Sequence, residues 1–328
     1  MSYRNLALLA AAIVAVGAGA PAAAKEKITF AYLLDPVYDA ALWPIRNGKV
    51  KSDLVEVEAK GLDIPALLQV TGAKSYDVVM TAVIGLPRAK ARGLELRIIA
   101  TGLRYHPNGD GADIWVKANS PIKTLADLKG KTIGAYSLPS TGITLMRIAL
   151  WKKYGVNVAY QGGDMKWVEM PAPALPGALA SGTIDAATLI HSQAYAASKS
   201  GEFRSLVRTA PAASEALGVH PVSAVHVGYP EKLAARPEAF KEFARLIKAS
   251  IDYTLKNADE VFPAAGKEAN IDPDFFRTWF GSFSQIPMVV AAQDVAAIQR
   301  VWELSKEMGI IDSVPRAAEM VWEHALRE

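Results

Sequence analysis

The fold is decided by one internal stretch, which reads Asn119-Ser120-Pro121-Ile122-Lys123-Thr124-Leu125-Ala126-Asp127-Leu128-Lys129-Gly130-Lys131-Thr132-Ile133-Gly134. Leu125 and Leu128 are three residues apart, so they share one face of a short helix over residues 124–131. Gly130 permits the positive φ that ends such a helix. Residues 132–135 then predict a strand. This succession is typical of a unit in which helices cover a sheet.

The same alternation of strands and helices continues on both sides of this stretch. On its N-terminal side the patterns predict strands at 28–34, 54–59, 76–81 and 95–101, with helices at 37–47, 64–71 and 85–92. On its C-terminal side they predict strands at 166–170, 184–190 and 223–227, with helices at 143–154 and 175–181. Beyond that only helices are expected, at 237–256, 258–268, 273–280, 289–308 and 315–326. No long flexible linker interrupts this order, which favours two α/β lobes with a ligand cleft between them.

The N-terminus has the layout of a secretory signal peptide. Arg4 is followed by an apolar run from Leu6 to Ala20, and small residues stand at the Ala22-x-Ala24 positions. The apolar run is shorter than the ~20 residues of a membrane-spanning helix, which argues against the alternative of a membrane anchor. We therefore expect cleavage after Ala24 and a periplasmic mature protein.

Composition excludes several kinds of chemistry. The 328 residues include no cysteine, so disulfides, thiolate nucleophiles and cysteine-ligated metals are ruled out. A net charge of +3 gives no reason to expect a nucleic-acid partner. The five histidines show no metal-ligand spacing; they are His106, His191, His220, His226 and His324. The sequence contains neither a P-loop nor a nucleophile elbow. We expect no metal and no cofactor.

Residues 119–134 resemble the S-P-I-K-T-L-x-D-L-K-G-K-x-I-G segment of type 2 periplasmic substrate-binding proteins, and most closely the nitrate/sulfonate/taurine-binding family of ABC-transporter receptors. Further segments are similar to that family: Ala178–Ala187, Tyr76–Val79 and Pro237–Phe243. The resemblance implies an α/β fold of two lobes, a ligand cleft between them and a helical C-terminal segment. It also implies a monomeric receptor, not an enzyme, that captures a small organic anion by hinge closure and delivers it to an ABC permease and its ATPase in the inner membrane.

The family architecture further implies that the chain crosses twice between the lobes, near Gly111–Trp115 and near Ser223–Val227. After the signal peptide at 1–24, lobe one then comprises residues 25–112 together with the mostly helical return segment 226–328. Lobe two comprises residues 113–225.

The strongest local candidate for ligand binding is the loop between the strand at 132–135 and the following helix. This loop, residues 136–142, begins with Tyr136 and contains Ser137, Ser140, Thr141 and Gly142. Ser140 or Thr141 can cap the helix, whose free N–H groups and positive dipole end attract an anion. The resemblance implies that this kind of loop binds the anionic head of the ligand. A plain helix cap without a ligand is the alternative.

Further candidates follow other predicted strands. They are Asp35, Tyr38, Thr81, Arg104, Tyr105, His191, Gln193 and His226. Arg104 is attractive because a guanidinium holds a carboxylate or sulfonate with two parallel hydrogen bonds. The alternatives are a solvated Arg104, tyrosines that belong to the core, and a buried structural His226. Asp35 would repel an anion, so it is expected to orient Arg104 or to meet a ligand amine or hydroxyl.

Two other functions compete with transport. A ligand-sensing partner of a membrane signalling protein would use the same lobes. Enzymes also occur on this fold, but the thiamine-pyrimidine synthases rely on a cysteine-rich iron motif that this chain lacks, and the menaquinone-pathway enzymes work in the cytoplasm. Sulfonates, taurine, nitrate and carboxylates remain open as ligands. Tyrosines near the expected cleft favour a larger carboxylate or an aromatic anion.

Overall fold

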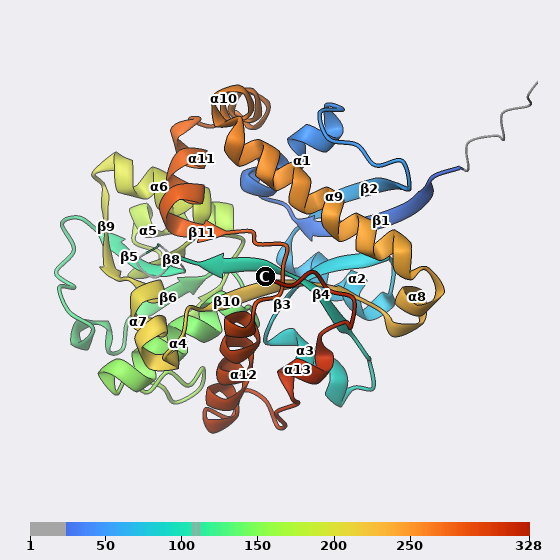
Figure 1. The fold of residues 1–328 in the computed structure, drawn as a ribbon. Coiled ribbons are helices and arrows are strands. Elements are labelled where there is room, and N and C mark those ends of the chain that lie inside the picture. Colours follow the sequence, from blue (N-terminus) through green and yellow to red (C-terminus); the bar gives the residue numbers. More distant parts are fainter. Residues whose placement is uncertain (1–23, 107–108, 110–111) are drawn as a thin grey trace, which may run out of the picture.

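The structure is a computed structural model that describes residues 24–106, 109 and 112–328. Apart from Ala24, the predicted signal peptide lies outside the described residues. The remaining chain folds around two sheets, with helices on their faces (Figure 1).

The first sheet has six strands in the order β11-β4-β10-β3-β1-β2. β1 pairs in parallel with β2 and β3, whereas β10 runs antiparallel to β3 and β4. Ile28, Phe30, Ala31 and Tyr32 of β1 are all buried, so both faces of this inner strand are covered. The strands are β1 (Glu26–Leu33), β2 (Val55–Leu62), β3 (Val78–Ala82), β4 (Arg97–Tyr105), β10 (Val222–Gly228) and β11 (Ser284–Gln285).

The second sheet has five strands in the order β7-β6-β8-β5-β9. They are β5 (Asp113–Lys117), β6 (Thr132–Ala135), β7 (Lys166–Glu169), β8 (Ala186–Leu189) and β9 (Phe203–Val207). The chain thus leaves the first sheet after β4 and returns to it at β10. We call the first sheet with its helices lobe one and the second sheet with its helices lobe two. The boundaries at 112/113 and 225/226 stay predictions.

Helices cover both sheets. Lobe one carries α1 (Pro36–Arg46), α2 (Ile64–Ala73), α3 (Gly85–Ala91), α8 (Pro230–Ala235), α9 (Pro237–Lys256), α10 (Ala258–Ala269), α11 (Asp274–Thr278), the π-helix η3 (Trp279–Phe283), α12 (Ala292–Glu307) and α13 (Ala317–Met320). Lobe two carries the 3-10 turns η1 (Ala126–Leu128) and η2 (Ala172–Ala174) with α4 (Thr141–Tyr154), α5 (Leu175–Ser181), α6 (His191–Ser200) and α7 (Thr209–Leu217). In Figure 1, α12 lies below the two sheets, where it also contacts α4 and α7 of lobe two.

The structure corrects several sequence predictions. The sequence did not predict α6, β9, α7 or α8, and the tail contains the short strand β11. The helix expected at 124–131 is only the 3-10 turn η1, and the one expected at 315–326 is only α13. β4 continues to Tyr105, so Arg104 and Tyr105 belong to a strand and not to a loop.

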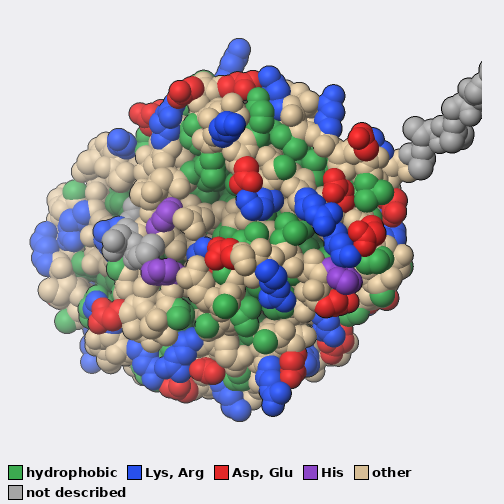
Figure 2. All heavy atoms as spheres, in the orientation of Figure 1, with side chains coloured by type: hydrophobic (Ala, Val, Ile, Leu, Met, Phe, Trp, Pro, Cys, Tyr) green, Lys and Arg blue, Asp and Glu red, His purple; other side chains and the backbone are tan. Residues whose placement is uncertain are grey.

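The described helices and the visible surface carry no sign of a membrane-spanning segment or of a strongly charged face. Within residues 24–106, 109 and 112–328, no helix combines the length and the apolarity needed to cross a membrane. Figure 2 shows basic and acidic side chains interspersed over the visible face, without a broad patch of one sign. The face seen in Figure 2 therefore has no basic patch of the kind that binds nucleic acid.

Candidate ligand-binding site

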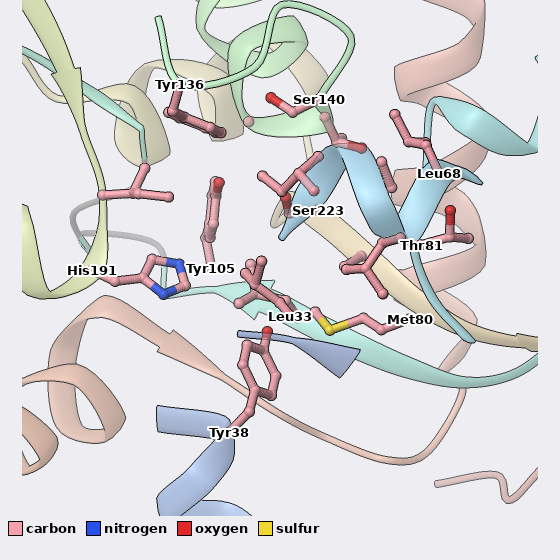
Figure 3. A pocket seen from close by; sticks show the side chains of 18 residues that line it. Leu33, Tyr38, Leu68, Met80, Thr81, Tyr105, Tyr136, Ser140, His191 and Ser223 are labelled. Atoms are coloured by element: carbon pink, nitrogen blue, oxygen red, sulfur yellow. The ribbon is translucent and has the colours of Figure 1, made fainter. Parts of the chain in front are cut away.

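A cavity of about 620 Å3, its opening included, lies where the two lobes meet. Both lobes contribute walls to it (Figure 3). From lobe one come Leu33, Tyr38, Ile64, Leu67, Leu68, Met80, Thr81, Ala82, Leu103, Tyr105, Ser223 and Ala224. From lobe two come Tyr136, Ser140, Thr141, Gly142, Ile190 and His191. These walls are mostly apolar, and among the described residues that line them there is no lysine or arginine.

The first turn of α4 forms one side of the cavity. Ser140 caps this helix, because its Oγ accepts a hydrogen bond of 3.3 Å from the backbone N–H of Ile143. The first turn carries no acidic side chain, while Lys152 and Lys153 lie in the last turn. The positive end of the helix dipole therefore faces the cavity without a competing carboxylate in its own turn.

Two tyrosine hydroxyls lie against this turn. A Cβ atom at Gly142 would come within 2.1 Å of the Tyr136 hydroxyl and 3.2 Å of the Tyr105 hydroxyl. Only glycine therefore fits at position 142 without moving Tyr136. Burial raises the pKa of Tyr105 to about 12, and it also raises the pKa of Tyr136. Both side chains are neutral phenols at physiological pH and can donate hydrogen bonds to a ligand.

Tyr38 brings a third hydroxyl to the cavity. Its side chain is almost fully buried, and its hydroxyl points into the cavity without a hydrogen-bond partner (Figure 3). Burial, reinforced by the nearby Asp35, holds its pKa well above the usual value. A buried donor without a partner is unfavourable in an empty site and becomes useful when a ligand supplies an acceptor.

Asp35 and His191 meet across the cleft beside Tyr38. One Asp35 oxygen accepts a hydrogen bond from the backbone N–H of Val37 and so caps α1. The other lies 2.9 Å from Nδ1 of His191, although this ring nitrogen is not aligned for a hydrogen bond. His191 has a φ of 47° and packs on Trp279 of the π-helix η3. A strained backbone and a π-helix at one place are typical of functional sites.

Other polar contacts also join the lobes. Thr141 Oγ1 accepts a hydrogen bond of 3.2 Å from the backbone N–H of Ile84. Arg88 Nη1 donates one of 3.3 Å to the carbonyl oxygen of Pro139. The structure thus holds the first turn of α4 against lobe one.

The structure brings most of the predicted site residues together. Those that line the cavity are Tyr38, Thr81, Tyr105, Ser140, Thr141, Gly142 and His191. Asp35 does not line it, but contacts His191. Whether these residues bind a ligand stays a prediction.

Arg104 lies outside the cavity lining. Its guanidinium forms a bidentate ion pair with Asp294, in which both nitrogen–oxygen distances are 2.7 Å. Asp294, and not Asp35, therefore orients this arginine. The reason is the pleat of β4: Leu103 and Tyr105 face the cavity, so the intervening Arg104 faces the other side of the sheet.

The remaining predicted residues, Ser137, Gln193 and His226, also lie outside the lining. His226 is enclosed in β10, where neither ring nitrogen has a hydrogen-bond partner and burial lowers its pKa to about 3. Its ring packs on Phe30 and lies so close to Gly102 that a Cβ there would come within 2.9 Å. His226 is therefore a neutral core side chain, which was the alternative interpretation from the sequence.

Sequence reasoning missed much of the apolar wall. Ile64, Leu67 and Leu68 come from α2, and Ser223 from β10. Tyr136, by contrast, directly follows β6 and belongs to the loop that the sequence singled out as the strongest local candidate.

Two lobes around a shared cavity define the class of the protein, an α/β protein with the periplasmic-binding-protein fold. The chain belongs to the NMT1/THI5-like family, whose model matches residues 58–261. The family resemblance and the fold predicted from the sequence are therefore confirmed. Curated protein sequences give no significant match.

Solved structures with the same fold include several transport receptors. The periplasmic aliphatic sulphonate-binding protein SsuA of Escherichia coli is 17% identical, with a TM-score of 0.71 over 92% of this chain and 99% of its own. The alkanesulfonate-binding protein SsuA of Xanthomonas axonopodis pv. citri, bound to MOPS, is 19% identical, with a TM-score of 0.71 over 93% and 100%. The ligand-binding component of an ABC-type import system from Staphylococcus aureus, with zinc bound, is 16% identical, with a TM-score of 0.70 over 91% and 97%.

Proposed function

We propose that this protein is a periplasmic receptor of an ABC importer that captures a small organic anion, preferably an aromatic carboxylate or sulfonate, by closure of its two lobes. The observation that carries this proposal is the cavity between the lobes, into which the N-terminal turn of α4 points.

The head group of the ligand is proposed to lie at that turn. Backbone N–H groups at a helix N-terminus bind carboxylates and sulfonates well, and the neighbouring tyrosine hydroxyls add neutral donors. Similar structures include proteins named for binding alkanesulfonates, which agrees with an anionic head.

The body of the ligand is proposed to lie among the apolar side chains of both lobes. Leu33, Leu67, Leu68 and Met80 offer a surface that nitrate or taurine would leave largely uncovered. Burial of an aromatic ring against such a surface contributes about 25 cal/mol per Å2. This is why a larger, ring-bearing anion fits better than the smallest ligands.

Partners and location follow from the same proposal. The mature protein would be a monomer, cleaved after Ala24, that delivers its ligand to an ABC permease and its ATPase. Intact-mass analysis of the exported protein tests the cleavage site. A mature N-terminus other than Lys25 would contradict the prediction.

A thermal-shift panel on the protein beginning at Lys25 tests the ligand class. The panel contains nitrate, taurine, alkanesulfonates, and aliphatic and aromatic carboxylates and sulfonates. The buffer contains no sulfonic acid, because MOPS is bound in a similar structure. A ligand at about 100 times its Kd stabilises the folded state by about 2.7 kcal/mol, a shift of a few degrees in Tm. A shift with aromatic anions supports the proposal, whereas none with any anion refutes it.

A further inference from the structure

A second concavity adjoins the cavity, and we call it the outer groove. Its lining includes Leu68, Thr81, Gly85, Arg88, Arg92 and Pro139. Leu68 and Thr81 line both the outer groove and the cavity. The two spaces therefore share a wall, which Thr81 and Leu68 form at the end of the cavity away from Tyr38 (Figure 3).

Arg88 lies close to the first turn of α4. It is half-buried on α3, and its Nη1 donates to the carbonyl oxygen of Pro139, the residue that directly precedes the helix cap Ser140. The guanidinium thus reaches the same end of α4 that faces the cavity. It approaches from the side of the outer groove.

The charge of Arg88 is not neutralised by the protein. Within the part of the chain that the structure describes, no carboxylate forms an ion pair with Arg88, and Asp312, which lines a neighbouring groove with it, forms none either. Burial lowers the pKa of Arg88; the nearby Tyr160 acts in the opposite direction, and the positive charges of Arg147 and Arg92 lower the pKa further. The guanidinium groups of Arg88, Arg92 and Arg147 therefore lie near one another here. One carboxylate, that of Glu169, accepts a 2.6 Å hydrogen bond from the backbone N–H of Leu138 in the loop before α4.

We propose that Arg88 is the residue that selects charged ligands: the acidic group lies where cavity and outer groove meet, between the first turn of α4 and the guanidinium. This inference rests on the proposed function, because it assigns the counter-charge of the same ligand. The cavity lining itself contains no lysine or arginine, and a helix N-terminus offers only about half a unit charge. Arg88 supplies a full one and can form charge-assisted hydrogen bonds.

The test compares acids with their neutral amides. Binding of benzoate, benzamide, benzenesulfonate and benzenesulfonamide is measured by isothermal titration calorimetry in Tris-chloride buffer. The variants are Arg88→Gln, which keeps a donor for Pro139 but no charge, and Arg88→Lys, which keeps the charge. Arg316→Gln, on an exposed arginine of lobe one, is the matched control. Circular dichroism and thermal unfolding confirm that each variant is folded.

The wild-type protein is expected to prefer each acid over its amide by at least tenfold. Arg88→Gln should reduce this preference about tenfold while leaving amide affinity unchanged, and Arg88→Lys should retain most of it. Arg316→Gln should behave as the wild type.

Two results would overturn the role of Arg88 alone. In one, Arg88→Gln keeps the full preference for acids. In the other, it weakens acids and amides equally, which is the signature of a contact that only joins the lobes. A wild-type protein that binds none of the four compounds, or binds acids no better than amides, would refute the proposed aromatic-anion receptor itself. The two failures are therefore distinguishable.

Discussion

The unpartnered hydroxyl of Tyr38 leads to a prediction that separates stability from binding. Tyr38→Phe removes only this oxygen, which is buried without a hydrogen-bond partner. Tyr229→Phe is the matched control, because its equally buried hydroxyl donates a 2.9 Å hydrogen bond to the carbonyl oxygen of Thr71. The two substitutions delete the same atom, which has no hydrogen-bond partner in Tyr38 and has one in Tyr229.

The expected free energies of unfolding follow from this difference. A buried polar group without a partner costs about 1–3 kcal/mol, part of which water in the cavity recovers. Tyr38→Phe should therefore leave the free energy of unfolding unchanged or raise it by up to about 1 kcal/mol. Tyr229→Phe breaks the hydrogen bond to the carbonyl oxygen of Thr71, which then keeps a 3.4 Å bond from the backbone N–H of Lys74. It should lower that free energy by about 1 kcal/mol.

Urea unfolding at pH 7 without ligand measures both values, and calorimetric titration with the ligand found in the panel measures affinity. Because the Tyr38 hydroxyl points into the cavity, Tyr38→Phe should weaken binding about three- to tenfold despite its unimpaired stability. A loss of stability as large as that of Tyr229→Phe would refute the assignment of an unsatisfied donor. Unchanged affinity would show that the hydroxyl does not contact the ligand.

Three further predictions concern other parts of the fold. Burial lowers the pKa of His226 to about 3 in the folded protein, from about 6.5 for an exposed histidine, so the unfolded chain binds the proton more tightly. The contribution of His226 to the free energy of unfolding is then complete above about pH 6.5 and is lost as the pH decreases. Between pH 7 and pH 5 the wild type should lose about 2 kcal/mol relative to His226→Leu, measured by urea unfolding. The same pH dependence of the free energy of unfolding in both proteins would contradict this. Gly142→Ala places a Cβ against the Tyr136 hydroxyl, so it should lower the free energy of unfolding by about 1–3 kcal/mol and weaken ligand binding. The control Gly177→Ala, whose Cβ would have nothing within 4 Å, should stabilise α5 slightly. Equal thermal unfolding midpoints of the two variants would argue against the close approach of Gly142 to Tyr136. Arg104→Met removes the ion-pair partner of the buried Asp294 and should lower the free energy of unfolding by about 3 kcal/mol, while the ligand Kd stays unchanged. A large change in Kd at constant stability would instead support Arg104 as a ligand contact.

Local patterns explain why part of this fold was predictable. The stop at Gly130, the strand β6 and the helix α4 depend on neighbouring residues, and their predicted ranges agree with the structure within a few positions. The position of Ser140 as a helix cap is local in the same sense, because a hydroxyl before an apolar helix has one main use.

Other features depend on contacts that no local pattern contains. Arg104 and its partner Asp294 are 190 residues apart in the sequence. Successive side chains of β4 face opposite sides of the sheet, so a shift of one residue decides whether a side chain faces the cavity. The sequence places the end of the strand only to within a few residues and therefore does not show which side Arg104 faces. The segments of α6 and α7 are rich in alanine and serine, and such helices pack without an apolar stripe that would reveal them.

The contacts of α4 with lobe one determine how the two lobes can move relative to each other in the proposed closure. Lobe one holds it near both ends, through Ile84 at Thr141 and through Glu307, whose carboxylate lies 2.8 Å from Nζ of Lys152. Eleven residues separate these points, a span of about 16 Å along the helix. A rotation of about 10° about the Lys152 end would move Thr141 by roughly 3 Å, enough to break its hydrogen bond while the ion pair stays intact. Opening and ligand release would thus be coupled at the N-terminus of α4, with the opposite end of the helix as the fulcrum.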